Sequence, residues 1–279
     1  MKGDASAGTG ELVIRARRGW QPIDLAEIWR YRELLGFLAW RDVTIRYRQT
    51  VLGAVWAVAQ PLTAALIFTV FFQRLGDPRG DGPPYPLFVF VGLVPWLFFA
   101  NAVTAAGASM VGNPQLVSKI YFPRVFIPLS SIGALLVDLV LSLASAAALM
   151  LVFRWPPSPA VAWLPLFLVA TVLTAVGPGL ILAALNVHYR DVKYAVPFLV
   201  QMGLFVTPVI YPLAGMPARL QPLAALNPMT GPVEGVRHAL LGTPVRAELV
   251  ATSLTVGVLL FVAGLYVFRR MERRLADVI

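Results

Sequence analysis

The sequence predicts an all-α polytopic membrane protein with about six transmembrane helices. The 279 residues are 58% hydrophobic and only 13% charged, which is more apolar surface than a soluble domain of this size can bury. Mean hydropathy is +0.73. Several apolar runs approach the roughly 20 residues that cross a hydrocarbon core, and basic residues gather in alternate connections between them. The predicted spans are 51–73, 87–107, 128–153, 161–185, 196–213 and 248–268.

The distribution of Lys and Arg predicts the orientation. Segments 1–50, 108–127, 186–195 and 269–279 hold 17 of the 23 basic residues, and the other six, Arg237 among them, fall between the remaining pairs of spans. By the positive-inside rule the first group and both termini are cytoplasmic, and the inverted topology is the weaker alternative. This distribution also explains the net charge of +9 without nucleic acid.

We therefore divide the chain into four parts. A polar cytoplasmic N-terminus covers 1–23, an amphipathic interfacial or connecting helix covers 24–50, a single six-helix transmembrane domain covers 51–268, and a basic cytoplasmic C-terminus covers 269–279.

The segment before the first span predicts an N-terminal interfacial helix at about 24–38. Asp24 and Glu27 have the spacing of a capping box, directly after Pro22. Apolar, aromatic and arginine side chains then alternate, which is typical of a basic helix that lies in the cytoplasmic membrane interface. The alternative is a plain stop-transfer flank, which accounts for the later arginines but not for the aromatic residues between them.

The sequence indicates neither a catalytic site nor a site that would supply the energy for transport. There is no Gly-Lys dipeptide, so a Walker-type phosphate loop is excluded, and there is no cysteine. Asp138 is the charged residue near the middle of a span, and we expect a carboxyl group bonded between helices, with a proton relay as the alternative. His188 and His238 fall on opposite sides of the membrane and cannot share a metal. We expect no enzyme activity and no metal site, and any ATP must be hydrolysed by another chain.

Seven prolines interrupt segment 207–244. Its apolar stretches are too short to cross a membrane. Two short re-entrant helices on the periplasmic side, near 217–226 and 231–241, would satisfy the pattern because neighbouring protein can shield a broken backbone from lipid. An ordinary outside loop is the alternative.

The connection between the second and third predicted spans reads GNPQLVSKIYFPRVFIPLSS. Asn113 and Pro114 suit a helix start, and Pro123 and Pro128 bracket a short turn. We expect this helix to dock with a soluble partner, and adsorption to lipid headgroups is the alternative. The connection 186–195 is a second candidate contact. The expected contact residues are Asn113, Pro114, Leu116, Val117, Lys119, Ile120, Phe122, Arg124, Arg190 and Asp191.

Three stretches of the chain carry a family resemblance: RDVTIRYRQTVLGAVWAVAQPL at 41–62, NPQLVSKIYFPRVFIPLSS at 113–131 and NVHYRDVKYAVPFLVQMGLFVTPVIYP at 186–212. They resemble the permease subunit of type-2 ABC exporters, specifically the polysaccharide group that exports O-antigen, capsule and teichoic acid. The resemblance implies a coupling helix at 113–124 and gate helices at 215–241. It also implies a homodimer in the inner membrane with two separate ATPase subunits, which bind the ATP and magnesium.

The resemblance further implies a long glycan on a lipid carrier as the substrate. Sugar rings bind aromatic faces weakly, so a glycan channel is expected to use aromatic side chains, although most aromatic residues in spans face lipid. Basic residues at the inner interface are expected to attract the carrier's phosphate groups, and anchoring to anionic lipid explains them equally well. The channel candidates are Phe68, Phe71, Phe72, Trp96, Phe98, Phe99 and Phe205, and the headgroup candidates are Arg41, Arg46 and Arg48.

The functional prediction is therefore the transmembrane subunit of an ATP-driven exporter of a lipid-linked polysaccharide. An ABC exporter of drugs or other small amphiphiles would share the fold. A proton-coupled carrier that uses Asp138 belongs to a different mechanistic class and is the third alternative.

Overall fold

The computed structural model describes residues 29–48, 53–73, 82–119, 122–189 and 191–278, and within these ranges the chain is helical with no strand. Four helical segments are long and apolar enough to cross a membrane: Tyr85–Gly112, Phe126–Val152, Pro159–His188 and Ala247–Glu272. Two shorter apolar helices, Val55–Phe71 and Val192–Val206, accompany them. The main helices are α2 (Arg32–Arg48), α3 (Gly53–Gln73), α4 (Tyr85–Gly112), α5 (Pro114–Lys119), α6 (Phe126–Ala134), α7 (Leu136–Val152), α8 (Leu164–His188), α9 (Val192–Val206), α10 (Gln221–Ala225), α11 (Thr230–Leu241) and α12 (Ala247–Val278).

Helix α4 lies at the centre of the bundle, where α3, α6, α7, α8, α9 and α11 all pack against it. Most of its side chains are buried. Helices α8 and α12 pack closely because two glycines face each other: a Cβ atom at Gly177 or Gly264 would overlap the backbone of the opposite helix. Small residues at such crossings are typical of helices that associate in lipid.

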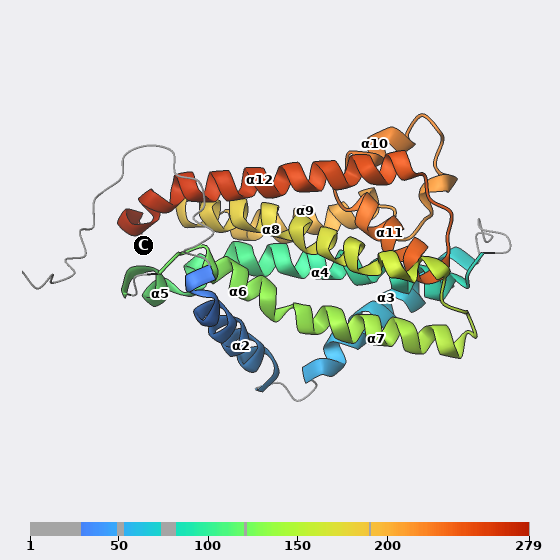
Figure 1. Cartoon of the computed structure of the whole chain (residues 1–279), viewed down its shortest axis with the longest axis horizontal. Coiled ribbons are helices and arrows are strands. Elements are labelled where there is room, and N and C mark those ends of the chain that lie inside the picture. Colours follow the sequence, from blue (N-terminus) through green and yellow to red (C-terminus); the bar gives the residue numbers. More distant parts are fainter. Residues whose placement is uncertain (1–28, 49–52, 74–81, 120–121, 190, 279) are drawn as a thin grey trace, which may run out of the picture.

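The long helices run alternately between two ends of the molecule (Figure 1). One end carries α5, the start of α2 and the C-terminal end of α12, and the other carries α10 and the connection into α12. The predicted coupling loop and the C-terminus therefore lie at the same end. The third predicted span is present as α6 and α7, with a bend between them.

The predicted span 196–213 is wrong as a continuous helix. Helix α9 has 15 residues and ends at Val206, because Pro208 disfavours helical geometry at Thr207, whose backbone is extended. At 1.5 Å per residue the helix is about 22 Å long. The chain from Thr207 to Pro212 continues without regular helix.

Helix α2 lies within the segment 24–50 assigned to an interfacial or connecting helix, and it continues to Arg48, beyond the 24–38 range expected for the interfacial part. The capping box at Asp24 and Glu27 lies outside the described residues. Of the two short helices predicted at 217–226 and 231–241, α11 agrees closely in extent, whereas α10 is only five residues long.

Arg237 on α11 is completely buried, although its place in the sequence suggested an outside connection. Its guanidinium donates to the carbonyl oxygens of Phe88 (3.2 Å), Pro208 (2.6 Å) and Val209. It also pairs with Glu234 at 3.1 Å and lies 3.7 Å from the centroid of the Phe88 ring. One cation thus joins α4, α11 and the segment that follows α9.

The close packing of Arg237 against Gly92 can be tested by adding a methyl group at Gly92. A methyl group at Gly92 would overlap the guanidinium, so Gly92→Ala is expected to destabilise the protein by about 1–3 kcal/mol through overpacking. The loss of stability is measured by heating the detergent-purified protein and following the folded fraction by size-exclusion chromatography. Gly112→Ala on the same helix is the control, because nothing lies within 4 Å of its added Cβ atom. Equal stability of the two variants would show that the packing around Arg237 is not close.

Candidate functional site

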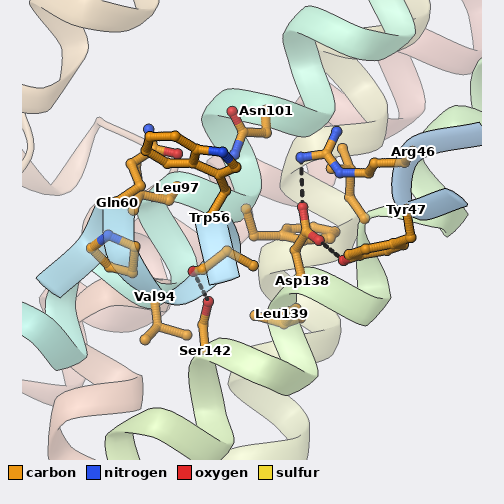
Figure 2. Close-up of a pocket in the computed structure, with 14 residues that line it drawn as sticks. Arg46, Tyr47, Trp56, Gln60, Val94, Leu97, Asn101, Asp138, Leu139 and Ser142 are labelled. Carbon is orange, nitrogen blue, oxygen red and sulfur yellow. Dashed lines mark hydrogen bonds and ion pairs between the residues drawn. The ribbon is translucent and has the colours of Figure 1, made fainter. Parts of the chain in front are cut away.

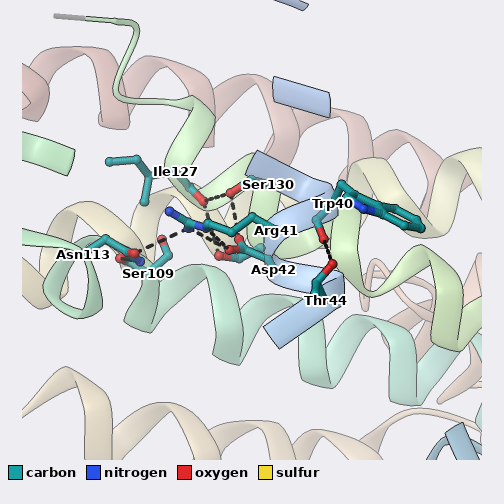
Figure 3. Close-up of polar contacts among 9 residues, drawn as sticks. Trp40, Arg41, Asp42, Thr44, Ser109, Asn113, Ile127 and Ser130 are labelled. Atoms are coloured by element: carbon teal, nitrogen blue, oxygen red, sulfur yellow. Dashed lines mark hydrogen bonds and ion pairs between the residues drawn. The ribbon is translucent and has the colours of Figure 1, made fainter. Parts of the chain in front are cut away.

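A polar network fastens α2 to the end of α4 and to α6 (Figure 3). Arg41 pairs with Asp42 at 2.7 Å and reaches the side-chain oxygen of Asn113 at 3.5 Å. Ser130 donates to the other carboxylate oxygen of Asp42 at 3.0 Å. Asn113 in turn donates to the carbonyl of Ser109 at 2.9 Å. The start of the predicted coupling segment is therefore in direct contact with α2.

The rest of the coupling segment divides into exposed and buried parts. Helix α5 covers only Pro114–Lys119. Leu116 packs partly against the core, and Phe122 is only 9% exposed, so the expectation that the Phe122 ring lies on an exposed contact face is wrong. Arg124 donates to the carbonyl of Glu272 at 2.9 Å, which ties the segment to α12.

Other predicted contact positions are not described. The side chains of Val117 and Lys119 and all of Ile120 and Arg190 lie outside the described residues. Asp191, just before α9, is exposed.

A second polar contact fastens α2 to α7 (Figure 2). Arg46 forms an ion pair with Asp138 at 2.7 Å, and the hydroxyl of Tyr47 donates to the other oxygen of the same carboxylate. Burial, together with the neighbouring carboxylate, raises the pKa of Tyr47 to about 12. Tyr47 therefore keeps its proton at physiological pH and remains a donor to Asp138.

The three headgroup candidates differ in their surroundings. Arg41 and Arg46 hold carboxylates of the protein itself, whereas Arg48, at the end of α2, is exposed. Any role of Arg41 or Arg46 toward a lipid phosphate must therefore compete with an existing ion pair.

The channel candidates do not gather at one place. Phe98 is buried and lines a cavity beside Asp138, whereas Trp96 and Phe99 line a second cavity against α9. Phe71 and Phe205 are more than half exposed on the outside of the single chain. Phe68 is partly buried, and the side chain of Phe72 is not described.

The cavity beside Asp138 combines polar groups with a mainly apolar lining, and sequence reasoning missed most of the residues that form it. Its volume is about 210 Å³, and α2, α3, α4 and α7 surround it. Trp56, Gln60, Asn101 and Ser142 contribute polar atoms to its wall. The signal that could have found them is the presence of amide side chains within apolar runs, where polar groups are costly. The second cavity, about 260 Å³, is lined mainly by apolar side chains.

Comparison with known proteins gives a consistent result. The sequence profile of the ABC-2 type transporter family matches residues 33–241. The O-antigen export system permease protein RfbA of Klebsiella pneumoniae is 27% identical over 88% of this chain and 95% of its own length. A protein of the same name from Myxococcus xanthus is 32% identical over 73% of this chain and 78% of its own. The polysialic acid transport protein KpsM of Escherichia coli is 23% identical over 72% and 78%.

The contact of Asp138 with two residues of α2 predicts that Asp138→Leu will loosen that helix. Loss of a hydrogen bond to a charged group and of a half-exposed ion pair amounts to about 1–2 kcal/mol. Hydrogen exchange of the α2 amides is therefore expected to quicken roughly tenfold.

Ser145→Ala is the control, because Ser145 lies on α7 but donates only to Leu141 of its own helix. If exchange in α2 is equally fast in both variants, α2 is held by other contacts.

Proposed function

The chain belongs to the ABC-2 type transporter family, and from this we propose that it is the transmembrane permease of an ATP-driven exporter of a lipid-linked polysaccharide. The family match covers residues 33–241, so the family that the sequence motifs indicated is confirmed. The observation that carries the proposed cargo is the agreement among relatives, whose names specify O-antigen or polysialic acid. These names favour a polysaccharide over a drug or another small amphiphile.

The proposed complex is a homodimer of this permease with two separate ATPase subunits. The sequence has no Walker-type loop, so ATP and magnesium belong to the partner. The pairing of Asp138 with Arg46 favours a structural role for this carboxylate over a proton relay. The chain itself is a permease and not an enzyme.

The proposed topology has six crossings of the inner membrane with both termini in the cytoplasm. Helices α3 and α9 supply the two crossings beyond the four long segments. The alternating direction of the helices and the common end of α5 and the C-terminus support this arrangement (Figure 1). The surplus of basic residues in the segments at that end supports a cytoplasmic location.

Coupling is proposed to begin at α5. Closure of the ATPase dimer on ATP would displace α5 and shift the equilibrium between closed and open states of the channel. The contact of Arg41 with Asn113 offers a route from α5 into α2, and the bond of Arg124 to Glu272 offers one into α12.

The opposite end is proposed to hold the gate. Helices α10 and α11 and the non-helical segment after α9 would close the periplasmic exit, anchored by Arg237. The channel aromatics and Arg48 are proposed to contact the glycan and its carrier along the way.

Introduction of negative charge on α5 tests its proposed role in docking the ATPase. Gln115 and Lys119 both belong to α5. Gln115→Glu combined with Lys119→Glu is expected to reduce co-purification of the ATPase at least tenfold, because like or unpaired charge at an interface costs several kcal/mol. Export of surface polysaccharide in complemented cells is expected to fall in parallel. Phe122 is unsuitable for this test because it is buried.

Arg219→Glu is the matched control, because it changes charge at an exposed position before α10, at the far end of the molecule. Undiminished co-purification of the α5 variant would refute docking through this helix. If cells that lack the gene still export their polysaccharide, the proposed cargo is wrong.

A further inference from the structure

The cavity beside Asp138 carries its polar groups on two unlike walls (Figure 2). On one side lie Trp56, Gln60 and Asn101, and on the other lie Arg46 and Tyr47 with the carboxylate of Asp138. Apolar side chains of α4 and α7 close the space between the walls. Ser142 donates to the carbonyl of Ala57 at 3.4 Å, which holds α7 against α3.

The side-chain amides on the first wall form no hydrogen bonds that stabilise the described part of the fold. The side-chain amide of neither Gln60 nor Asn101 forms a hydrogen bond to any residue that the structure describes, whereas the groups of the second wall bond one another. Asn101 is 11 residues before the end of α4, which is about 16 Å along the helix. Polar side chains at such depth are costly in a membrane protein and mark functional positions.

Trp56 makes the first wall accessible and aromatic. Its side chain is 60% exposed, and it is four residues before Gln60, so the indole and this amide lie on one face of α3. An exposed aromatic face beside amide donors and acceptors matches a sugar ring, which presents C–H groups on its faces and hydroxyl groups around its edge. A volume of about 210 Å³ is smaller than the sites of drug-sized ligands.

We propose that this cavity binds one sugar ring of the carrier-linked glycan, an inference that rests on the proposed function. Trp56 stacks on the ring, and Gln60 and Asn101 exchange hydrogen bonds with its hydroxyl groups. The paired Arg46 and Asp138 form a polar back wall. The α4 residues that line the site, Val94 to Asn101, are near the middle of that helix, so the site lies between the two ends of the bundle.

The charge of the back wall favours a sugar over a phosphate group. The carboxylate of Asp138 already neutralises Arg46, and a phosphate in the cavity would lie beside that carboxylate and meet like-charge repulsion. Hydroxyl groups both donate and accept hydrogen bonds, so they are compatible with the carboxylate and with the guanidinium.

Binding of two lipids to the purified permease tests the site. The first probe is the carrier-linked glycan that accumulates in cells lacking this gene, and the second is the same carrier lipid after removal of the glycan. Trp56→Leu and Gln60→Leu are suitable variants because both side chains are exposed, so neither is required for folding. Each is expected to weaken binding of the glycan-bearing lipid about five- to tenfold, which corresponds to one lost contact.

Binding of the glycan-free lipid is expected to stay unchanged in both variants. Trp163→Leu, which removes a similarly exposed indole (58%) outside the cavity, is the control and should bind both lipids like the unmodified protein. Equal loss for both lipids would overturn the inference, because the cavity would then bind the phosphate. Unchanged binding of the glycan-bearing lipid would overturn it while leaving the proposed function intact, whereas failure of the unmodified permease to bind that lipid would overturn both.

Discussion

The buried guanidinium of Arg237 satisfies backbone groups that the fold would otherwise leave unpaired. In lipid every carbonyl and amide must find a partner within the protein, and Pro208 ends α9 after only 15 residues. Arg237 donates to the carbonyls of Pro208 and Val209, where no helix can continue. Glu234 balances its charge, and Gly92 leaves space for it. The irregular segment is therefore built into the bundle and is not a loop on its surface.

Helix α2, near the end of the molecule that carries α5, is held by contacts between side chains and not by bonds to backbone carbonyls. Its contacts reach α4 by Asn113, α6 by Ser130 and α7 by Asp138. Each is a hydrogen bond or ion pair that is partly exposed, and such contacts contribute little individually. The surroundings of Arg237 are buried and closely packed, whereas the partly exposed contacts of α2 cost little to break. A displacement of α5, as proposed for coupling, would therefore disturb the α2 contacts more easily than those of Arg237.

Local patterns in the sequence predicted much of this architecture. Hydropathy predicted the long spans, and proline spacing predicted a helix that closely matches α11. Local patterns could not predict contacts between residues that are distant in the sequence. Tyr47 and Asp138 are 91 residues apart, and Arg237 and Phe88 are 149 residues apart. For the same reason Arg237 was counted with the outside residues, and Trp56, Gln60 and Asn101 were not seen as neighbours, although each is polar or aromatic in an apolar run.

The shortness of α9 has a consequence for the surrounding bilayer. A helix of about 22 Å is shorter than the roughly 30 Å thickness of the hydrocarbon core. In the proposed topology α9 crosses the membrane, so the bilayer beside it would thin locally to match the helix. For the proposed cargo, the distance to be shielded from lipid would then be smallest along this helix, and membranes made of longer acyl chains would increase that distance.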